Sequence, residues 1–191
     1  MSDDGPPYSD AAPPGTAAPD AATPDVDGPV SAEDQRPDEV RRADPVELER
    51  WRVLAARVLA DEDIPATAEL SLAFVDEAAM AELNAEHMGS DGPTDVLAFP
   101  LDGPEIAADP TIGGGAADGP PIVLGDVVIC PAVARRNAAE HAVTHDEELA
   151  LLVVHGVLHV LGHDHAEPEE TEVMRGRERF HLERERAAGA T

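Results

Sequence analysis

The clearest hydrophobic pattern in the chain is a long apolar segment, residues 149–161, in which two histidines are the main polar interruptions. Thr144, followed three residues later by Glu147, has the spacing of a capping box at the start of a helix. Glycine, found here at position 162, commonly ends a helix. Because a helix that is apolar all round lies in a protein core, we predict a buried helix that begins after Thr144 and ends at Gly162.

Three shorter segments have the pattern of strands. In residues 68–75 apolar and polar positions alternate, which is typical of a half-buried strand. Residues 94–99 and 125–130 each end in an apolar run of four residues, and a proline stops each run. These segments predict a small sheet.

Further helices are predicted around these strands. Asp44 before Pro45 has the residue types of an N-cap and a first helical position, and apolar residues then follow at helical spacing to Val58. A short helix follows Asp76, another follows residue 130, and the last opens at Pro168. Helices and strands are thus mixed around one sheet, which predicts a single α+β domain.

The ends of the chain differ from its middle. Residues 1–45 contain nine of the 18 prolines and few large apolar side chains, so we predict a disordered acidic tail there. The folded domain is expected to span residues 46–186, and residues 187–191 are expected to be a disordered C-terminus. Residues 101–121, rich in glycine, proline, alanine and aspartate, predict an exposed loop.

The net charge is −27, and all 13 basic residues are arginine. Such a charge repels polyanions and by itself argues against nucleic acid as a partner, although acidity also serves solubility. The single cysteine, Cys130, excludes an internal disulfide and fits a reducing compartment. With no apolar segment long enough to span a bilayer and no secretory signal, we expect a cytoplasmic protein without a membrane partner.

Four of the eight histidines lie in residues 155–165. His155 and His159 are four positions apart, so one helical turn places both imidazoles on the same face. Gly162 can turn the chain so that a later histidine reaches the same ion. One metal ion would satisfy several buried imidazoles together, and three nitrogen ligands with an open fourth position describe a catalytic zinc site.

The spacing also resembles the metzincin peptidase motif H-E-x-x-H-x-x-G-x-x-H, which makes His165 the third ligand after His155 and His159. The glutamate of that motif, the general base, is replaced by Gly156, which disfavours a zinc peptidase. Zinc alone still lowers the pKa of bound water toward about 7. A zinc site without this glutamate can therefore still promote attack of water on another electrophile, such as a phosphodiester.

Three motifs in order resemble the YbeY endoribonucleases, a family also described as rRNA maturation factors. Residues 155–165 match the family signature H-G-x-L-H-L-x-G-Y-D-H, residues 93–100 resemble P-T-D-V-L-S-F-P, and residues 124–130 resemble L-G-D-[IV]-x-[IL]-C. The likeness covers approximately residues 46–185. It implies a mixed four-stranded sheet with about five helices, and a zinc site on a buried helix and the turn after it.

The resemblance further implies one zinc ion held by His155, His159 and His165. It implies an endoribonuclease specific for single-stranded RNA that acts in 3′-end maturation of small-subunit (16S) rRNA and in ribosome quality control. The expected partners are ribosomal RNA and the ribosome or its assembly factors, with no DNA. The alternative is a non-catalytic ribosome-assembly adaptor in which zinc only stabilises the fold.

Asp95, His163 and Asp164 are candidates for the general acid and base, because they stand in or beside the motifs. Each also has a structural interpretation as a turn, cap or supporting residue. Arg135 and Arg136 are candidate RNA contacts, because an acidic protein needs a local group of cations to approach phosphate.

The chain departs from the family pattern at several positions. Met88 stands where many members have an arginine, Ala98 replaces a serine and His163 replaces a tyrosine. The first strand of the family fold should precede the first helix, where this chain is acidic and rich in proline. That strand is either absent or formed around Val30 or Val40.

Overall fold

The computed structural model describes residues 29–103, 122–164 and 167–189. Its centre is one four-stranded sheet with the strand order β1-β2-β4-β3. β1 and β2 are parallel, β2 and β4 are parallel, and β3 pairs antiparallel with β4 at the edge. The strands are β1 (Val30–Asp34), β2 (Ala68–Phe74), β3 (Val96–Pro100) and β4 (Ile122–Ile129). The mixed four-stranded sheet of an α+β domain is therefore confirmed.

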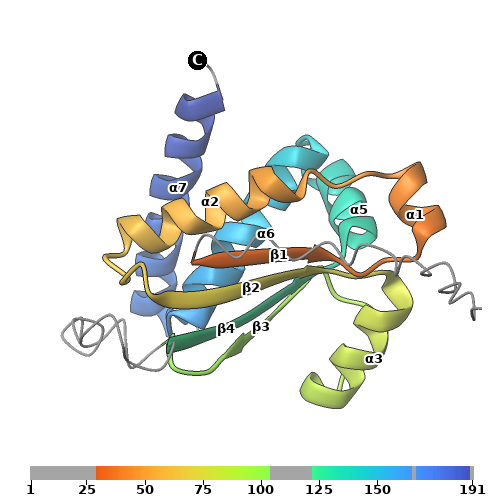
Figure 1. Ribbon diagram of the computed structural model, residues 1–191, viewed down its shortest axis with the longest axis horizontal. Coiled ribbons are helices and arrows are strands. Elements are labelled where there is room, and N and C mark those ends of the chain that lie inside the picture. Colours follow the sequence, from red (N-terminus) through yellow and green to blue (C-terminus); the bar gives the residue numbers. More distant parts are fainter. Residues whose placement is uncertain (1–28, 104–121, 165–166, 190–191) are drawn as a thin grey trace, which may run out of the picture.

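Six helices accompany the sheet in the described part of the chain, one more than the five expected. They are α1 (Asp38–Ala43), α2 (Leu48–Asp61), α3 (Glu77–Met88), α5 (Pro131–His141), α6 (His145–Val160) and α7 (Pro168–Gly189). Figure 1 shows α2, α5 and α6 above the sheet and α3 on the opposite side. The additional helix is α1, which lies before the expected start of the domain.

The N-terminal boundary at residue 45 is wrong, because β1 and α1 precede it. Val30 is 3% exposed and pairs with Leu70 of β2, whereas Val40 is 38% exposed on α1. Of the two places proposed for a first strand, the structure uses Val30. Pairing along the edge of β2 stabilises a segment whose own sequence has few apolar residues. Residues 1–28 of the expected tail lie outside the described residues.

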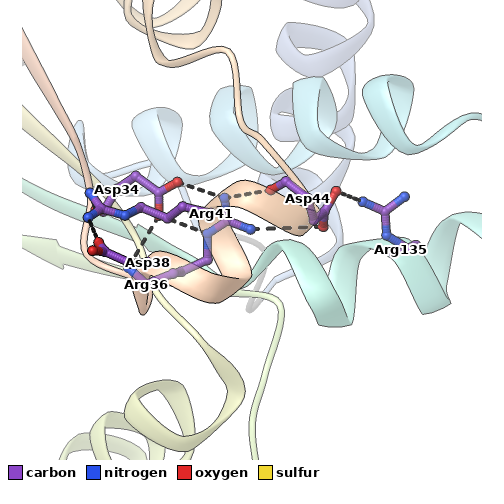
Figure 2. A network of polar contacts seen from close by, with 6 residues as sticks. All are labelled: Asp34, Arg36, Asp38, Arg41, Asp44 and Arg135. Carbon is purple, nitrogen blue, oxygen red and sulfur yellow. Dashed lines mark hydrogen bonds and ion pairs between the residues drawn. The ribbon is translucent and has the colours of Figure 1, made fainter.

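A network of polar contacts holds this N-terminal segment (Figure 2). The side chain of Arg36 is 2% exposed and donates to both carboxylate oxygens of Asp34, at 2.8 and 2.7 Å. Arg36 also donates to the backbone oxygen of Asp44 at 2.9 Å, and the Asp44 carboxylate pairs with Arg135. The charge of a buried arginine is thus compensated within the same short segment.

The prediction that Asp44 caps the first long helix is wrong. Asp44 follows α1, and α2 begins at Leu48 after Glu47. The Asp44 carboxylate pairs with arginines and therefore does not cap the amide groups of α2. The apolar stripe of this helix is correct, since Trp51 and Val58 are both buried.

Other helix ends agree with the sequence. Asp76 accepts a hydrogen bond from the backbone nitrogen of Ala79 at 2.9 Å and caps α3, which runs on to Met88. Thr144 and Glu147 form both bonds of the capping box of α6. Gly162 follows α6 with a φ of 89°, the left-handed conformation expected of it.

The C-terminal boundary also needs correction, because α7 continues to Gly189 rather than ending at residue 186. Ala187 and Ala188 have the strongest intrinsic preference for helix, so they extend it. No helix in the described ranges is long and apolar enough to cross a membrane.

The core places α6 directly on the sheet. Val153, Val154, Val157 and Leu158 of this helix are completely buried, in a cluster that includes residues of α2, β2 and β4. This packing fixes the position and rotation of α6 on the sheet. It therefore also fixes where the histidines of α6 lie.

Candidate active site

A pocket of about 440 Å³ opens between α6, the edge strand β3 and the end of α3. One part of its lining is polar and comes from α6 and the turn that follows, whereas the other part is apolar and comes from β3 and Met88. The lining residues are Met88, Val96, Leu97, Ala98, Pro100, His155, Gly156, His159, Gly162, His163 and Asp164.

The two histidines of α6 lie together in this pocket, as their spacing predicts. The ring centroids of His155 and His159 are 4.5 Å apart, with the ring planes at 77°. Both residues are partly buried. Two imidazoles brought this close by one helical turn can share a single ion.

A carboxylate supports the first of these rings. Nδ1 of His155 lies 2.7 Å from Oε1 of Glu178, which comes from α7. Because a carboxylate only accepts, the proton of this hydrogen bond is on Nδ1. Sequence reasoning missed Glu178, because it stands among alternating arginines and glutamates that resemble a solvated helix face.

The pocket holds two of the donors that a zinc ion requires. His155 and His159 fit as two nitrogen ligands, with Nε2 as the coordinating atom of His155 because Nδ1 faces Glu178. The predicted third ligand, His165, lies outside the described residues. Within the ranges that are described, no three histidine, cysteine, aspartate or glutamate side chains converge as a complete metal site. The donors that can be placed therefore fit a zinc ion that needs one further ligand.

Gly156 occupies one of the tightest contacts between α6 and the sheet. A Cβ atom at this position would lie 2.4 Å from Cγ1 of Val127 on β4. Such a distance is far inside van der Waals contact, so any side chain here would require Val127, the helix or the strand to move. The glutamate of a zinc peptidase does not fit here without that movement.

His163, the first catalytic candidate, lines the pocket and faces a buried carboxylate. Its Nε2 is 3.8 Å from Oε2 of Glu62, whose side chain is 7% exposed and which directly follows α2. Glu62 also contacts His181 Nε2 and Arg177 Nη1 of α7, each at 2.7 Å. Burial raises the pKa of Glu62, but the nearby imidazoles of His163 and His181 and the charge of Arg177 outweigh it and hold this pKa well below its usual range.

The two aspartate candidates differ in position. Asp164 lines the pocket. Asp95 does not, because its Oδ1 accepts from the backbone nitrogen of Val96 and its Oδ2 accepts from Nδ2 of Asn137, both at 2.8 Å. These bonds connect the start of β3 to α5, which is a structural task.

The structure does not bring the predicted RNA contacts to the pocket. Arg135 and Arg136 lie on α5, and neither lines the pocket. Arg135 pairs with Asp44, and Arg136 pairs with Glu77 at 2.8 Å. Met88, in contrast, lines the pocket and is 52% exposed.

Comparisons with known proteins agree with this arrangement. The model of a family described as Endoribonuclease YbeY matches residues 38–186, a range that includes every residue lining the pocket. The Endoribonuclease YbeY of Frankia alni is 46% identical over 132 residues, which cover 69% of this chain and 71% of that protein. The Endoribonuclease YbeY of Salinispora tropica is 48% identical over 130 residues, which cover 68% of this chain and 82% of that protein.

A likeness at the level of the fold is found with the solution structure of a protein from Thermotoga maritima. It is 26% identical to this chain, with a TM-score of 0.52. The match covers 75% of this chain and 83% of the other. The arrangement of helices and strands described above thus recurs in an independently determined structure.

Proposed function

The chain belongs to the YbeY family of endoribonucleases, hydrolases of RNA phosphodiester bonds, and we propose that it is a zinc-dependent enzyme specific for single-stranded RNA. Its proposed role is 3′-end maturation of small-subunit (16S) rRNA and ribosome quality control in the cytoplasm. The proposed partners are ribosomal RNA and the ribosome or its assembly factors. The observation that carries the proposal is the pair His155 and His159 in the wall of an open pocket.

The proposed zinc ligands are His155, His159 and His165. A zinc ion, when bound, supplies a Lewis acid for the phosphodiester and makes water a better nucleophile. The contact of His155 with the carboxylate of Glu178 favours this proposal, because histidine ligands of metals commonly donate their other ring N–H to such a group.

The remaining lining residues have proposed tasks that follow from their chemistry. The apolar side of the pocket, formed by Met88, Val96 and Pro100, can receive a nucleobase and exclude water from it. His163 and Asp164 are the proposed donors and acceptors of protons, because both line the pocket. Asp95 does not line the pocket, so we propose that it stabilises the start of β3 through its hydrogen bonds.

Two alternatives make different demands on the pocket. A zinc peptidase requires a general base on α6 next to the first histidine, and the contact of Gly156 with Val127 leaves no space for one. A non-catalytic assembly adaptor requires only the fold, and the acidic surface is its main support. The adaptor predicts binding to ribosomal particles without cleavage of RNA.

Incubation of the zinc-loaded full-length protein with an unstructured, end-labelled RNA tests the proposal. We expect cleavage by the wild type and a loss of roughly 100-fold or more in rate for His159→Ala, because removing a ligand weakens the metal site. His145→Ala is the matched control, since His145 lies on the same helix and does not line the pocket. Equal cleavage by wild type and His159→Ala would contradict the proposal.

A further inference from the structure

α7 contributes a side chain that contacts the first histidine of the pair, although it contributes none to the lining of the pocket. Glu178 lies on this helix, 23 residues after His155, and its side chain is 17% exposed. The His155 side chain is 27% exposed. A contact of 2.7 Å between two partly buried groups on different helices is a specific feature of the fold, not an encounter on the surface.

The position of Glu178 separates two roles. His155 lines the pocket, whereas Glu178 does not. Its carboxylate contacts Nδ1 of His155, so Nε2 is the ring nitrogen that Glu178 does not bind. Glu178 is therefore poorly placed to contact substrate and well placed to act through His155.

The hydrogen bond has three physical consequences for the ring. A carboxylate has no proton to donate, so it keeps the proton of the neutral imidazole on Nδ1 and the lone pair on Nε2. Its negative charge also strengthens that lone pair as a ligand, and the bond fixes the rotation of the ring about its Cβ–Cγ axis. All three effects favour binding of a cation at Nε2.

We propose that Glu178 is a positioning residue of the metal centre, which sets the tautomer and orientation of His155 for zinc. This inference rests on the proposed zinc site and deepens it. It also assigns a task to α7. This helix follows the histidine motif in the chain and contacts the motif through Glu178.

The direct test is the zinc dissociation constant of the full-length protein, measured by competition with a chromophoric chelator. We expect Glu178→Ala to weaken zinc binding by roughly 10- to 100-fold. Glu178→Gln should have a smaller effect, because the amide oxygen still accepts from Nδ1 while the charge is lost. Glu183→Gln is the control, since Glu183 is an exposed glutamate of the same helix.

Thermal unfolding of the metal-free proteins distinguishes the positioning role from a role in folding alone. Our inference predicts that the melting temperature of metal-free Glu178→Gln stays near that of Glu183→Gln, while only the former loses zinc affinity. If wild type binds zinc and both Glu178 variants bind it equally well, the positioning role is wrong and the zinc site stands. If wild type does not bind zinc, both proposals are overturned.

Discussion

At the scale of single residues, Gly156 affects both the chemistry open to the pocket and the packing of α6 on the sheet. In the sequence it marks a missing peptidase base, whereas in the structure it is a contact that admits no side chain, with Val127 at 2.4 Å from an ideal Cβ. Valine is branched at Cβ and has little freedom to move its methyl groups away. A glutamate on this turn would therefore have to displace Val127 or move α6 away from β4.

We predict that Gly156→Ala destabilises the protein by about 1–3 kcal/mol, the usual cost of overpacking a core. Gly176→Ala on α7 is the matched control, because the nearest atom to its Cβ would be 4.0 Å away. That variant should be neutral or more stable by about 0.5–1 kcal/mol, since alanine favours helix over glycine. Urea denaturation gives both free energies of unfolding, and equal stabilisation by the two substitutions would refute the packing argument.

At the scale of elements, β1 and α1 depend on a buried ion pair more than on apolar contacts. Only Val30 is buried among the five residues of β1, and α1 has no buried residue. Arg36 supplies the missing interactions through Asp34 and the end of α1 (Figure 2). Burial raises the pKa of Asp34, but the hydrogen bonds and charge of Arg36 outweigh this and lower it.

Arg36→Met should destabilise the protein by about 3–5 kcal/mol, because it leaves the Asp34 carboxylate buried without its partner. Arg42→Met is the control, since Arg42 forms an exposed pair with Asp38 at 3.6 Å and such pairs contribute about 0–1 kcal/mol. Adding Asp34→Leu to Arg36→Met should recover part of the loss. A denaturation series in which Arg36→Met and Arg42→Met cost the same would contradict this account.

At the scale of the whole molecule, the acidic charge and the RNA substrate oppose each other. The net charge is −27, and both arginines proposed as RNA contacts are paired with acidic residues. We predict that kcat/KM for single-stranded RNA rises between about 0.01 and 0.15 M ionic strength, because salt screens the long-range repulsion over that range. A steady fall would instead indicate that local cations such as Arg135 and Arg136 dominate RNA binding.

The sequence predicts the elements that have strong local signals and misses what depends on distant partners. The capping box of α6, the cap of α3 and the turn at Gly162 are determined by neighbouring residues, and the structure agrees with them. The sequence left the existence of β1 and its place, at Val30 or Val40, undecided, because its partner strand begins only at residue 68. Glu62 and Glu178 were missed because each reaches the histidines from another helix, and no local pattern marks such a contact.

We propose that one zinc ion in the histidine pocket makes this chain a nuclease for single-stranded RNA. The most direct measurement is a zinc titration of the metal-free protein, in which cleavage is followed on one RNA sequence in single-stranded and in fully paired form. Our account predicts that cleavage of the single strand increases until one zinc ion per chain is bound, and that the duplex stays largely intact. Cleavage that is independent of zinc content, or equal on both forms, would contradict it.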